Sequence, residues 1–324
     1  MPERCITHCS MPRSPDMAER PANGPTVLLV SDQRDWHARQ MDAAFTAAGA
    51  RVERVDLADC GFDTSSPSGL SLPALGSGLP DAVHVRTLSA GSFEAVTKRL
   101  GVLHALTKLG ITVWNDARAI ERCVDKSMTS FLLAEAGVPT PPTWTTESAE
   151  AARALIEREA PRGPLVLKPL FGAQGKGLRL IRRPGDLPGP EAVAGVFYLQ
   201  QFQLSATQDF TDYRLFVLRG RVIAAMMRRA PTWITNVKQG GEPLAIAPDP
   251  KMERLAIAAA EAVGAEIAGV DVFVTAQGAP TVLEVNSMPA WSGLQKVSKR
   301  NIAEAIASAL VDELARRPAP RRAP

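Results

Sequence analysis

The sequence predicts an α/β protein in which one unit of alternating strands and helices precedes two smaller α+β units. Three observations carry this expectation. Apolar strands and amphipathic helices alternate over residues 25–124, a pattern typical of a parallel sheet covered by helices. A glycine-rich loop at 172–177 then separates two short strands, and a long hairpin follows it.

The first unit is expected to hold four strands. TVLLVSD, RVERVDL, AVHVRT and ITVWND are short and apolar, as strands of a buried sheet are. Helices are predicted over residues 35–49 and over SFEAVTKRLGVLHALTKLG, which ends at Gly110. A Gly/Ser/Pro-rich loop spans roughly residues 59–80.

The second unit is expected over residues 125–203. It begins with the helix DKSMTSFLLAEAG and continues through VPTPPTW, which is extended because proline excludes helical conformation from the residue before it. The strands PLVLKPL and LRLI flank the loop FGAQGKG, and the unit closes on VFYLQQF.

The third unit is expected over residues 204–317. It opens with the hairpin YRLFVLRGRVIAAMMRRA, which turns at Arg219–Gly220. A helix at 251–264, two strands around Gly278 and a last helix from about 299 to 316 complete it. No internal repeat is visible.

The composition of the 324-residue chain, with 45% hydrophobic and 22% charged residues, is that of a globular protein. No apolar run approaches the ~20 residues that span a bilayer, and residues 1–24 lack the apolar core of a signal peptide. We expect a cytoplasmic protein with no membrane partner. Residues 1–24 are predicted to be a disordered lead, which leaves Met1, Met11 and Met17 as alternative starts.

The net charge is +3, from 37 basic and 34 acidic residues. Four of the arginines lie in ARRPAPRRAP, which ends in an expected tail at 318–324, so the rest of the chain is nearly neutral. A nucleic-acid-binding protein normally carries a basic stripe on a folded face. No nucleic-acid partner is therefore expected.

The four cysteines are too few and too irregularly spaced for a disulfide framework. Cys5 and Cys9 flank a histidine in CITHC. A disordered segment is expected there rather than a metal site, because a tetrahedral zinc site needs a fourth ligand and an ordered scaffold.

The glycine loop GAQGKG suits an anion, since small residues let backbone amides approach it. It is not a Walker motif, because Leu170 and Gly177 occupy the places of a required glycine and a Ser or Thr. A plain hairpin loop is the alternative. Lys168, in the apolar strand before the loop, favours the anion site, because a buried lysine costs free energy unless an anion meets it. Lys126 is a second candidate, with a surface lysine as its alternative.

Acidic and amide side chains follow in the third unit. Glu284 and Asn286 are expected on one side of a strand, because side chains alternate with period two, and Asp271 lies between apolar residues in GVDVF. Three oxygen donors suit a hard cation such as Mg²⁺ better than zinc. An internal hydrogen-bond network is the alternative.

Charged residues on the hairpin lie between these two sets. The guanidinium groups of Arg214, Arg228 and Arg229 suit a carboxylate or phosphate, and Asp212 accompanies them. A surface ladder of charges is the alternative. Nothing indicates a catalytic nucleophile, since the chain has no G-x-S-x-G and its histidines lie far from these strands in the sequence.

These motifs occur in the order found in ATP-grasp ligases. Lys126, VLKPLFGAQGKG, YLQQF, DYRLFV, TNVKQGG, GVDVF and LEVNSMPAWSGLQ resemble the RimK-like α-L-glutamate ligases from about residue 82 to 316. VRTLSAGSFEAVTKRLGVLHALTKLG and NDARAIERCVDKSMTSFLL are similar to the branch that adds glutamate to tetrahydromethanopterin. The resemblance implies the ATP-grasp fold, with a pre-ATP-grasp domain at 25–124 and two subdomains, a lid at 125–203 and a C-terminal subdomain at 204–317, that sandwich ATP.

The resemblance also implies the roles of individual residues. Two lysines would hold ATP phosphates under the glycine loop, the hinge residues would contact adenine largely through backbone groups, and one acid would contact the ribose. The expected nucleotide-binding residues are Lys126, Lys168, Gly172, Gln174, Gly175, Lys176, Gly177, Gln201, Phe202 and Asp212.

Two Mg²⁺ or Mn²⁺ ions would be held by Asp271, Glu284 and Asn286. Arg214, Arg229 and Asn236 would lie near phosphate or a substrate carboxylate as catalytic residues.

Two positions depart from the family pattern. Gln201 stands where the family usually has Glu, which weakens the expectation that this side chain reads the adenine amino group. Ile234 replaces an arginine common in relatives, so it cannot contact phosphate as a charge, and Lys238 is a candidate to compensate.

The implied activity is an ATP- and Mg-dependent carboxylate–amine ligase that joins L-glutamate to a small-molecule acceptor through an acyl phosphate. A tetrahydromethanopterin-type pterin is the acceptor that the finer resemblance implies. The alternatives are another acceptor (a ribosomal-protein tail or a deazaflavin coenzyme), another ATP-grasp product class, and a non-catalytic ATP-binding protein. The number of glutamates added stays open, as does homo-oligomer formation.

Overall fold

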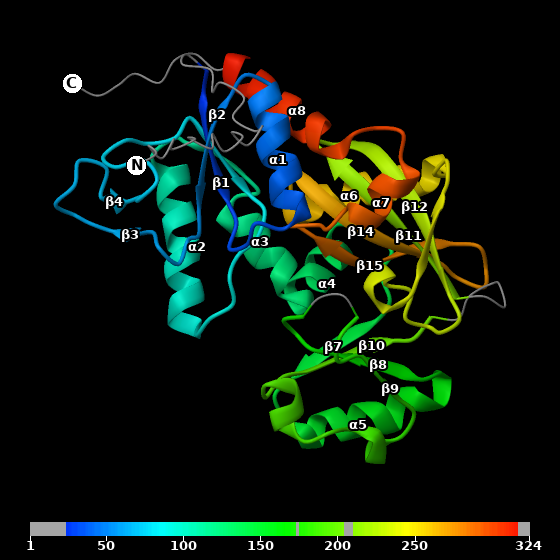
Figure 1. Cartoon of the computed structure of the whole chain (residues 1–324). Helices are drawn as coiled ribbons and strands as arrows, with labels where there is room; N and C mark the ends of the chain where they lie inside the picture. The colour runs from blue at the N-terminus through cyan, green and yellow to red at the C-terminus, as the bar shows by residue number, and fades with distance from the viewer. Residues whose placement is uncertain (1–23, 173–174, 204–209, 317–324) are drawn as a thin grey trace, which may run out of the picture.

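A computed structural model of the chain describes residues 24–172, 175–203 and 210–316. Over these residues the chain forms three main sheets and one small two-stranded sheet (Figure 1). The expected lead up to residue 23, with Cys5 and Cys9, and the expected tail at 318–324 lie outside the described residues. Within those residues, none of the helices combines the length and the apolar composition that crossing a bilayer requires.

The first sheet is parallel throughout and has the order β2-β1-β5-β6, which confirms the predicted parallel unit. Its strands are β1 (Thr26–Val30), β2 (Arg51–Val55), β5 (Ala82–Val85) and β6 (Thr112–Trp114). Its helices are α1 (Trp36–Ala47), α2 (Phe93–Lys108) and α3 (Ala117–Val124). The residue before each helix caps it, because its side chain accepts a hydrogen bond from a backbone amide of the first turn. The capping residues are Asp35 for α1, Ser92 for α2 and Asp116 for α3.

Two features of this unit differ from the expectation. The loop at 59–80 contains a short hairpin, β3 (Gly61–Phe62) and β4 (Leu70–Ser71). Helix α3 was not expected. Only eight residues separate its capping residue, Asp116, from Asp125, which caps the following helix.

The second sheet is antiparallel, in the order β7-β10-β8-β9. Its strands are β7 (Thr143–Thr146), β8 (Leu165–Lys168), β9 (Arg179–Ile181) and β10 (Phe197–Gln201). Helix α4 (Lys126–Glu135) leads into it, and α5 (Ala149–Glu159) covers one face. The predicted strands are present, whereas α5 was missed and the proline-rich linker runs on into β7. This lid sheet lies apart from the other two, at the bottom of Figure 1.

The third sheet is also antiparallel, in the order β13-β12-β11-β14-β15. Its strands are β11 (Phe210–Leu218), β12 (Arg221–Ala230), β13 (Glu242–Ala245), β14 (Ile267–Val274) and β15 (Pro280–Asn286). Its helices are α6 (Pro250–Val263), α7 (Ser292–Val297) and α8 (Ile302–Arg316). The predicted hairpin turns at Arg219 and Gly220, both at positive φ. The expected last helix is α8, whereas α7 and β13 were missed.

The two faces of the third sheet differ in what they pack against. One face buries Leu215, Val270 and Val285 against α6. On the other face, one end packs Phe216 and Trp291 into the core shared with α1 and α8. The opposite end of this second face is polar, and it lies towards the lid sheet.

The first unit is fixed to the third by buried hydrogen bonds. Asn115, which is 1% exposed, donates through Nδ2 to the carbonyls of Ile267 and Ser287 at 2.6 and 2.5 Å and accepts from the Ile267 amide at 3.0 Å. His37 Nε2 accepts from the amides of Trp291 and Ser292 at 3.1 and 3.2 Å. These contacts hold the start of β14 and the segment after β15, so they fix the strands that carry the acidic residues.

One histidine of the first unit is buried among apolar residues. His84 on β5 is 2% exposed, and neither ring nitrogen has a hydrogen-bond partner among the residues described. Its ring lies 5.6 Å from that of Phe45. Burial, together with the charge of Arg86, lowers the pKa of His84 from 6.5 to about 3.

This shift predicts a pH dependence of stability. Between pH 6.5 and about 3 the unfolded chain binds a proton at His84 that the folded protein does not, so stability falls as the pH falls through that window. We predict that His84→Leu is at least as stable as the parent near pH 7. Its advantage in free energy of unfolding should grow by about 1.4 kcal/mol per pH unit below 6.5.

Urea denaturation across this pH range measures the effect. His104→Leu is the control, because His104 is exposed. Parallel pH curves for the parent and His84→Leu would contradict the prediction.

Candidate active site

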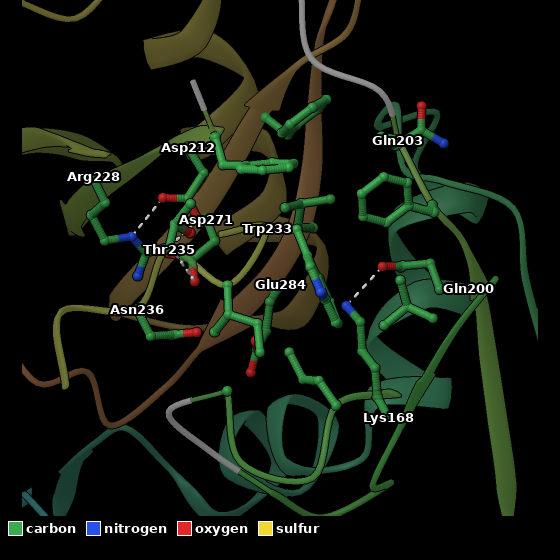
Figure 2. Close-up of a pocket in the computed structure, with 18 of the residues that line it drawn as sticks. Lys168, Gln200, Gln203, Asp212, Arg228, Trp233, Thr235, Asn236, Asp271 and Glu284 are labelled. Atoms are coloured by element: carbon green, nitrogen blue, oxygen red, sulfur yellow. Dashed lines mark hydrogen bonds and ion pairs between the residues drawn. The ribbon is translucent and has the colours of Figure 1, made fainter. Parts of the chain in front are cut away.

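A pocket lies between the lid sheet and the polar end of the third sheet (Figure 2). The lid contributes two lysines, the glycine loop and the end of β10, and the third sheet contributes acids, aromatic residues and an arginine. Of the residues predicted from sequence, the pocket brings together Lys126, Lys168, Gly172, Gly175, Lys176, Gln201, Phe202, Asp212, Asn236, Asp271 and Glu284.

Five predicted residues are placed differently or not described. Gly177, Arg214, Arg229 and Asn286 do not line the pocket, although Arg214 contacts a residue that does. Gln174 lies outside the described residues. The roles proposed for these five stay predictions.

Both lysines meet neutral oxygen atoms. Lys126, 8% exposed at the start of α4, donates to the carbonyls of Leu170 and Gly172 at 3.2 and 2.9 Å. Lys168 donates to Gln200 Oε1 at 2.7 Å. Burial lowers the pKa of Lys168, Lys126 lowers it further, and Glu284 and Asp271 oppose them. Neither lysine forms an ion pair with a described residue, so both charges are available to an anion.

Four charged side chains form a buried network on the floor of the pocket. Arg214 binds Asp271 through Nε and through Nη2, the latter at 2.8 Å. Arg228, 4% exposed, binds both oxygens of Asp212 and reaches Asp271 Oδ2 at 3.1 Å. Such pairs are favourable only when every charge keeps its partner.

The network sets the ionisation of its members. Burial acts to raise the pKa of Asp271, but Arg214 and Arg228 outweigh it and the pKa is lowered. For Asp212, burial prevails over Arg228 and, with the charge of Asp271, raises the pKa. Burial acts to lower the pKa of Arg228, and the two carboxylates reverse this and raise it.

Arg228 and Arg229 are neighbours in sequence but lie on opposite faces of β12, as alternation requires. Arg228 lines the pocket. Arg229 is exposed and binds Glu242 at 2.8 Å. The sequence does not distinguish the two, because the register of the hairpin decides which arginine faces Asp212, and Asp212 pairs with Arg228.

The acidic strand β15 contains a β-bulge. Its pairing with β14 jumps from Asp271↔Glu284 to Val272↔Val282, which leaves Leu283 as an extra residue. Leu283 and Glu284 therefore both line the pocket, while Val282 and Val285 both pack against α6. Glu284 has no hydrogen bond or ion pair within the described ranges.

The oxygen donors fit a hard cation. Asp271 and Glu284 are cross-strand partners, and Asn286 donates through Nδ2 to the Gly269 carbonyl at 3.4 Å, which leaves its amide oxygen for a ligand. Such a set suits Mg²⁺, although Asp271 also holds two arginines. The part of the chain described here has no group of three or more His, Cys, Asp and Glu placed to hold a metal.

The glycine loop meets the third unit across the pocket. A Cβ on Gly175, which has φ +71°, would lie 2.5 Å from Asn236 Oδ1 and 2.9 Å from Ile234 Cγ2. Only glycine allows this approach together with that backbone conformation.

The predicted hinge uses its amides within the lid. The amides of Gln201 and Phe202 donate to the carbonyls of Pro142 and Pro164 at 2.9 and 3.0 Å. The side chain of Gln201 donates to Pro164 as well, at 3.2 Å. Adenine contacts through the amides of these two residues are thus not available in this state, and their carbonyl groups are the remaining candidates.

Sequence reasoning missed several residues of the pocket wall. Phe202 meets Trp233 edge to face, with ring centroids 5.9 Å apart, and Trp233 lies centrally in Figure 2. Gln200, Gln203, Thr235, Phe273 and Leu283 also line the pocket. Four of them belong to motifs that carry the family resemblance: Gln200 to YLQQF, Thr235 to TNVKQGG, Phe273 to GVDVF and Leu283 to LEVNSMPAWSGLQ. Trp233 and Gln203 lie outside these motifs.

The network predicts unequal effects of two adjacent substitutions. Arg228→Met would leave two buried carboxylates with one arginine, which should lower the free energy of unfolding by about 3–5 kcal/mol. Arg229→Met, at an exposed ion pair, should lower it by less than ~1 kcal/mol. Chemical denaturation of both variants measures the difference, and equal losses would contradict the assignment of Arg228 to the network.

Comparisons with known proteins agree with this geometry. The family model described as "RimK-like ATP-grasp domain" matches residues 123–310. A tetrahydromethanopterin:α-L-glutamate ligase of Methanosarcina acetivorans is 31% identical over 82% of this chain and 92% of its own. One from Methanococcus maripaludis is 35% identical over 60% of this chain and 67% of its own.

The solved structure of the ATP-grasp ligase PsnB with minimal precursor, Mg and ADP is similar in fold. Its TM-score is 0.67 at 21% identity, and the match covers 90% of this chain and 98% of that one. The three sheets are thus those of an ATP-grasp fold, as the sequence predicted. The chain belongs to the RimK-like ATP-grasp family and is a ligase of that family.

Proposed function

We propose that this protein is an ATP- and Mg²⁺-dependent ligase that joins the α-amine of L-glutamate to an acceptor carboxylate. The pocket carries the proposal, because two lysines without carboxylate partners face Asp271 and Glu284 across it. A polyphosphate is anionic enough for the lysines and can also bridge to a cation at the acids. The names of the relatives support glutamate as the amine donor.

The reaction has two steps. The acceptor carboxylate attacks the γ-phosphorus of ATP, the bond to the β-phosphate oxygen breaks, and an acyl phosphate and ADP form. The amine of glutamate then attacks the acyl carbon, loses a proton, and expels inorganic phosphate to leave an amide. No enzyme nucleophile is needed, which agrees with a pocket built from cations and carboxylates.

The residues act by position and charge. Lys126 and Lys168 are assigned to phosphate oxygens, and Asp212, which also binds Arg228, is assigned to a ribose hydroxyl. Asp271, Glu284 and Asn286 would hold the metal, with two ions as the expected number. When bound, Mg²⁺ or Mn²⁺ supplies positive charge that neutralises the phosphate oxygens.

Charges outside the metal ligands are assigned to the substrates. Arg228, which lines the pocket, and Arg214, which binds Asp271, are assigned to the transferring phosphoryl group. Asn236 lies beside the glycine loop, where it can orient a phosphate or a substrate carboxylate. Arg229, on the opposite face of β12 and paired with Glu242 at 2.8 Å, stays a prediction for a substrate carboxylate.

We propose a tetrahydromethanopterin-type pterin as the acceptor, on the strength of the relatives' names. Phosphate release from ATP with Mg²⁺ and L-glutamate, with and without acceptors, tests the reaction, and mass spectrometry identifies the product. The panel holds such a pterin, a deazaflavin coenzyme and a ribosomal-protein tail. A gain of one glutamyl residue on the pterin alone supports both parts. A gain on another acceptor overturns only the acceptor. The absence of any glutamate-dependent product overturns the proposed joining of glutamate.

Glu284 offers the cleanest test of the metal site. Because its carboxylate has no partner among the described residues, we predict that Glu284→Gln lowers kcat by roughly 100-fold or more and leaves the thermal midpoint unchanged. Asp271→Ala should also abolish turnover, but it would unpair two arginines as well.

Steady-state kinetics and Mn²⁺ binding, followed by electron paramagnetic resonance, measure the loss. Glu157→Gln, on the exposed side of α5, is the control. Parent-like turnover and Mn²⁺ affinity in Glu284→Gln would remove Glu284 from the metal site.

A further inference from the structure

The ammonium of Lys168 donates a hydrogen bond to a neutral side chain and not to a carboxylate. Gln200 Oε1 accepts its hydrogen bond at 2.7 Å, as Figure 2 shows. Gln200 lies on β10, next to β8, and is 2% exposed. A buried amide is retained only where its hydrogen bonds are made, since an unpaired one costs free energy.

The orientation of this amide is fixed by its other partners. Gln200 Nε2 donates to Thr143 Oγ1 at 3.3 Å and to the Tyr198 hydroxyl at 3.4 Å. Thr143 gives its own proton to the Pro141 carbonyl at 3.0 Å, so towards Gln200 it acts as an acceptor. A flipped amide would place two donors against the ammonium. The oxygen therefore faces Lys168.

The same chain continues to the second lysine of the pocket. The Tyr198 hydroxyl lies 2.8 Å from Ser130 Oγ, and Tyr198 is 1% exposed. Ser130 follows Lys126 by four residues on α4, a spacing that puts both on one side of a helix. A continuous row of buried and partly buried hydrogen bonds thus runs from Lys168 to the helix that carries Lys126.

A neutral acceptor has a chemical consequence. A carboxylate at this position would pair with Lys168 and cancel the charge that a phosphate requires. The acids that do act on Lys168, Glu284 and Asp271, lie across the pocket on the third sheet and form no ion pair with it. The amide can hold the lysine in place while leaving its charge to the ligand.

We propose that Gln200 is a positioning residue, which presents the charged Lys168 to the phosphates of the bound nucleotide. The inference rests on the proposed function, because it assumes that Lys168 contacts phosphate. A residue with only a packing role would affect nucleotide binding whether or not Lys168 is present. Gln200 is expected to affect it only when Lys168 is present.

A double-mutant cycle tests this dependence. Gln200→Glu keeps the shape of the side chain and adds a charge, and Gln200→Asn keeps the amide but withdraws its oxygen from Lys168. Each is made with Lys168 present and with Lys168→Met. The affinity for Mg-bound ADP and for a non-hydrolysable ATP analogue is measured by calorimetry, and thermal unfolding reports the fold.

We expect each Gln200 variant to weaken nucleotide binding about tenfold when Lys168 is present, the loss of one charge-assisted contact. In the Lys168→Met background the same variants should change affinity less than about twofold. Gln277→Glu, in an exposed turn, controls for added charge. Asparagine keeps the scheme testable if the glutamate variant fails to fold.

The outcomes separate this inference from the proposed function. Equal losses in both backgrounds, or no loss in either, would overturn the positioning role while parent binding upholds the nucleotide site. Failure of the parent protein to bind either nucleotide would overturn the proposed function and the inference together.

Discussion

The buried network of Asp212, Arg228, Asp271 and Arg214 is the constraint on which the pocket depends. It joins three adjacent strands of the third sheet, so the positions of the acids follow from sheet register rather than from flexible loops. Space for it is made locally. A Cβ on Gly269 would lie 2.7 Å from Arg214 Nη1, so the missing side chain lets the guanidinium reach Asp271. At the floor of the pocket, the ion pairs therefore depend on the backbone and on the absence of a side chain at Gly269.

Charge is divided between the two walls of the pocket. The lid supplies Lys126 and Lys168, which donate hydrogen bonds to carbonyl and amide oxygens. The third sheet supplies carboxylates, of which that of Glu284 has no partner among the described residues. Each wall alone carries charge that is incompletely compensated. A ligand with phosphate groups and an accompanying cation would compensate both.

Much of this could be predicted from the sequence, where the signal was local. Apolar alternation gave the strands of the parallel unit, and Lys168 and Asp271 stood out as charges within apolar runs. The remainder depends on pairing between distant segments. The bulge at Leu283 is invisible until β15 is placed against β14, and the choice between Arg228 and Arg229 awaits the hairpin register. Gln200 looks like any polar residue of a strand until Lys168 is beside it.

The contacts of Lys126 have a consequence for how the loop and the ligand are related. An ammonium carries three protons, and two of them are given to the carbonyls of Leu170 and Gly172 at the entrance of the glycine loop. One proton remains for the phosphate that the proposed function assigns to it. The same side chain thus supports the start of the loop and keeps a donor for that ligand. The position of Leu170 and Gly172 and the proposed phosphate contact depend on one atom, Nζ, so a change at Lys126 would alter both at once.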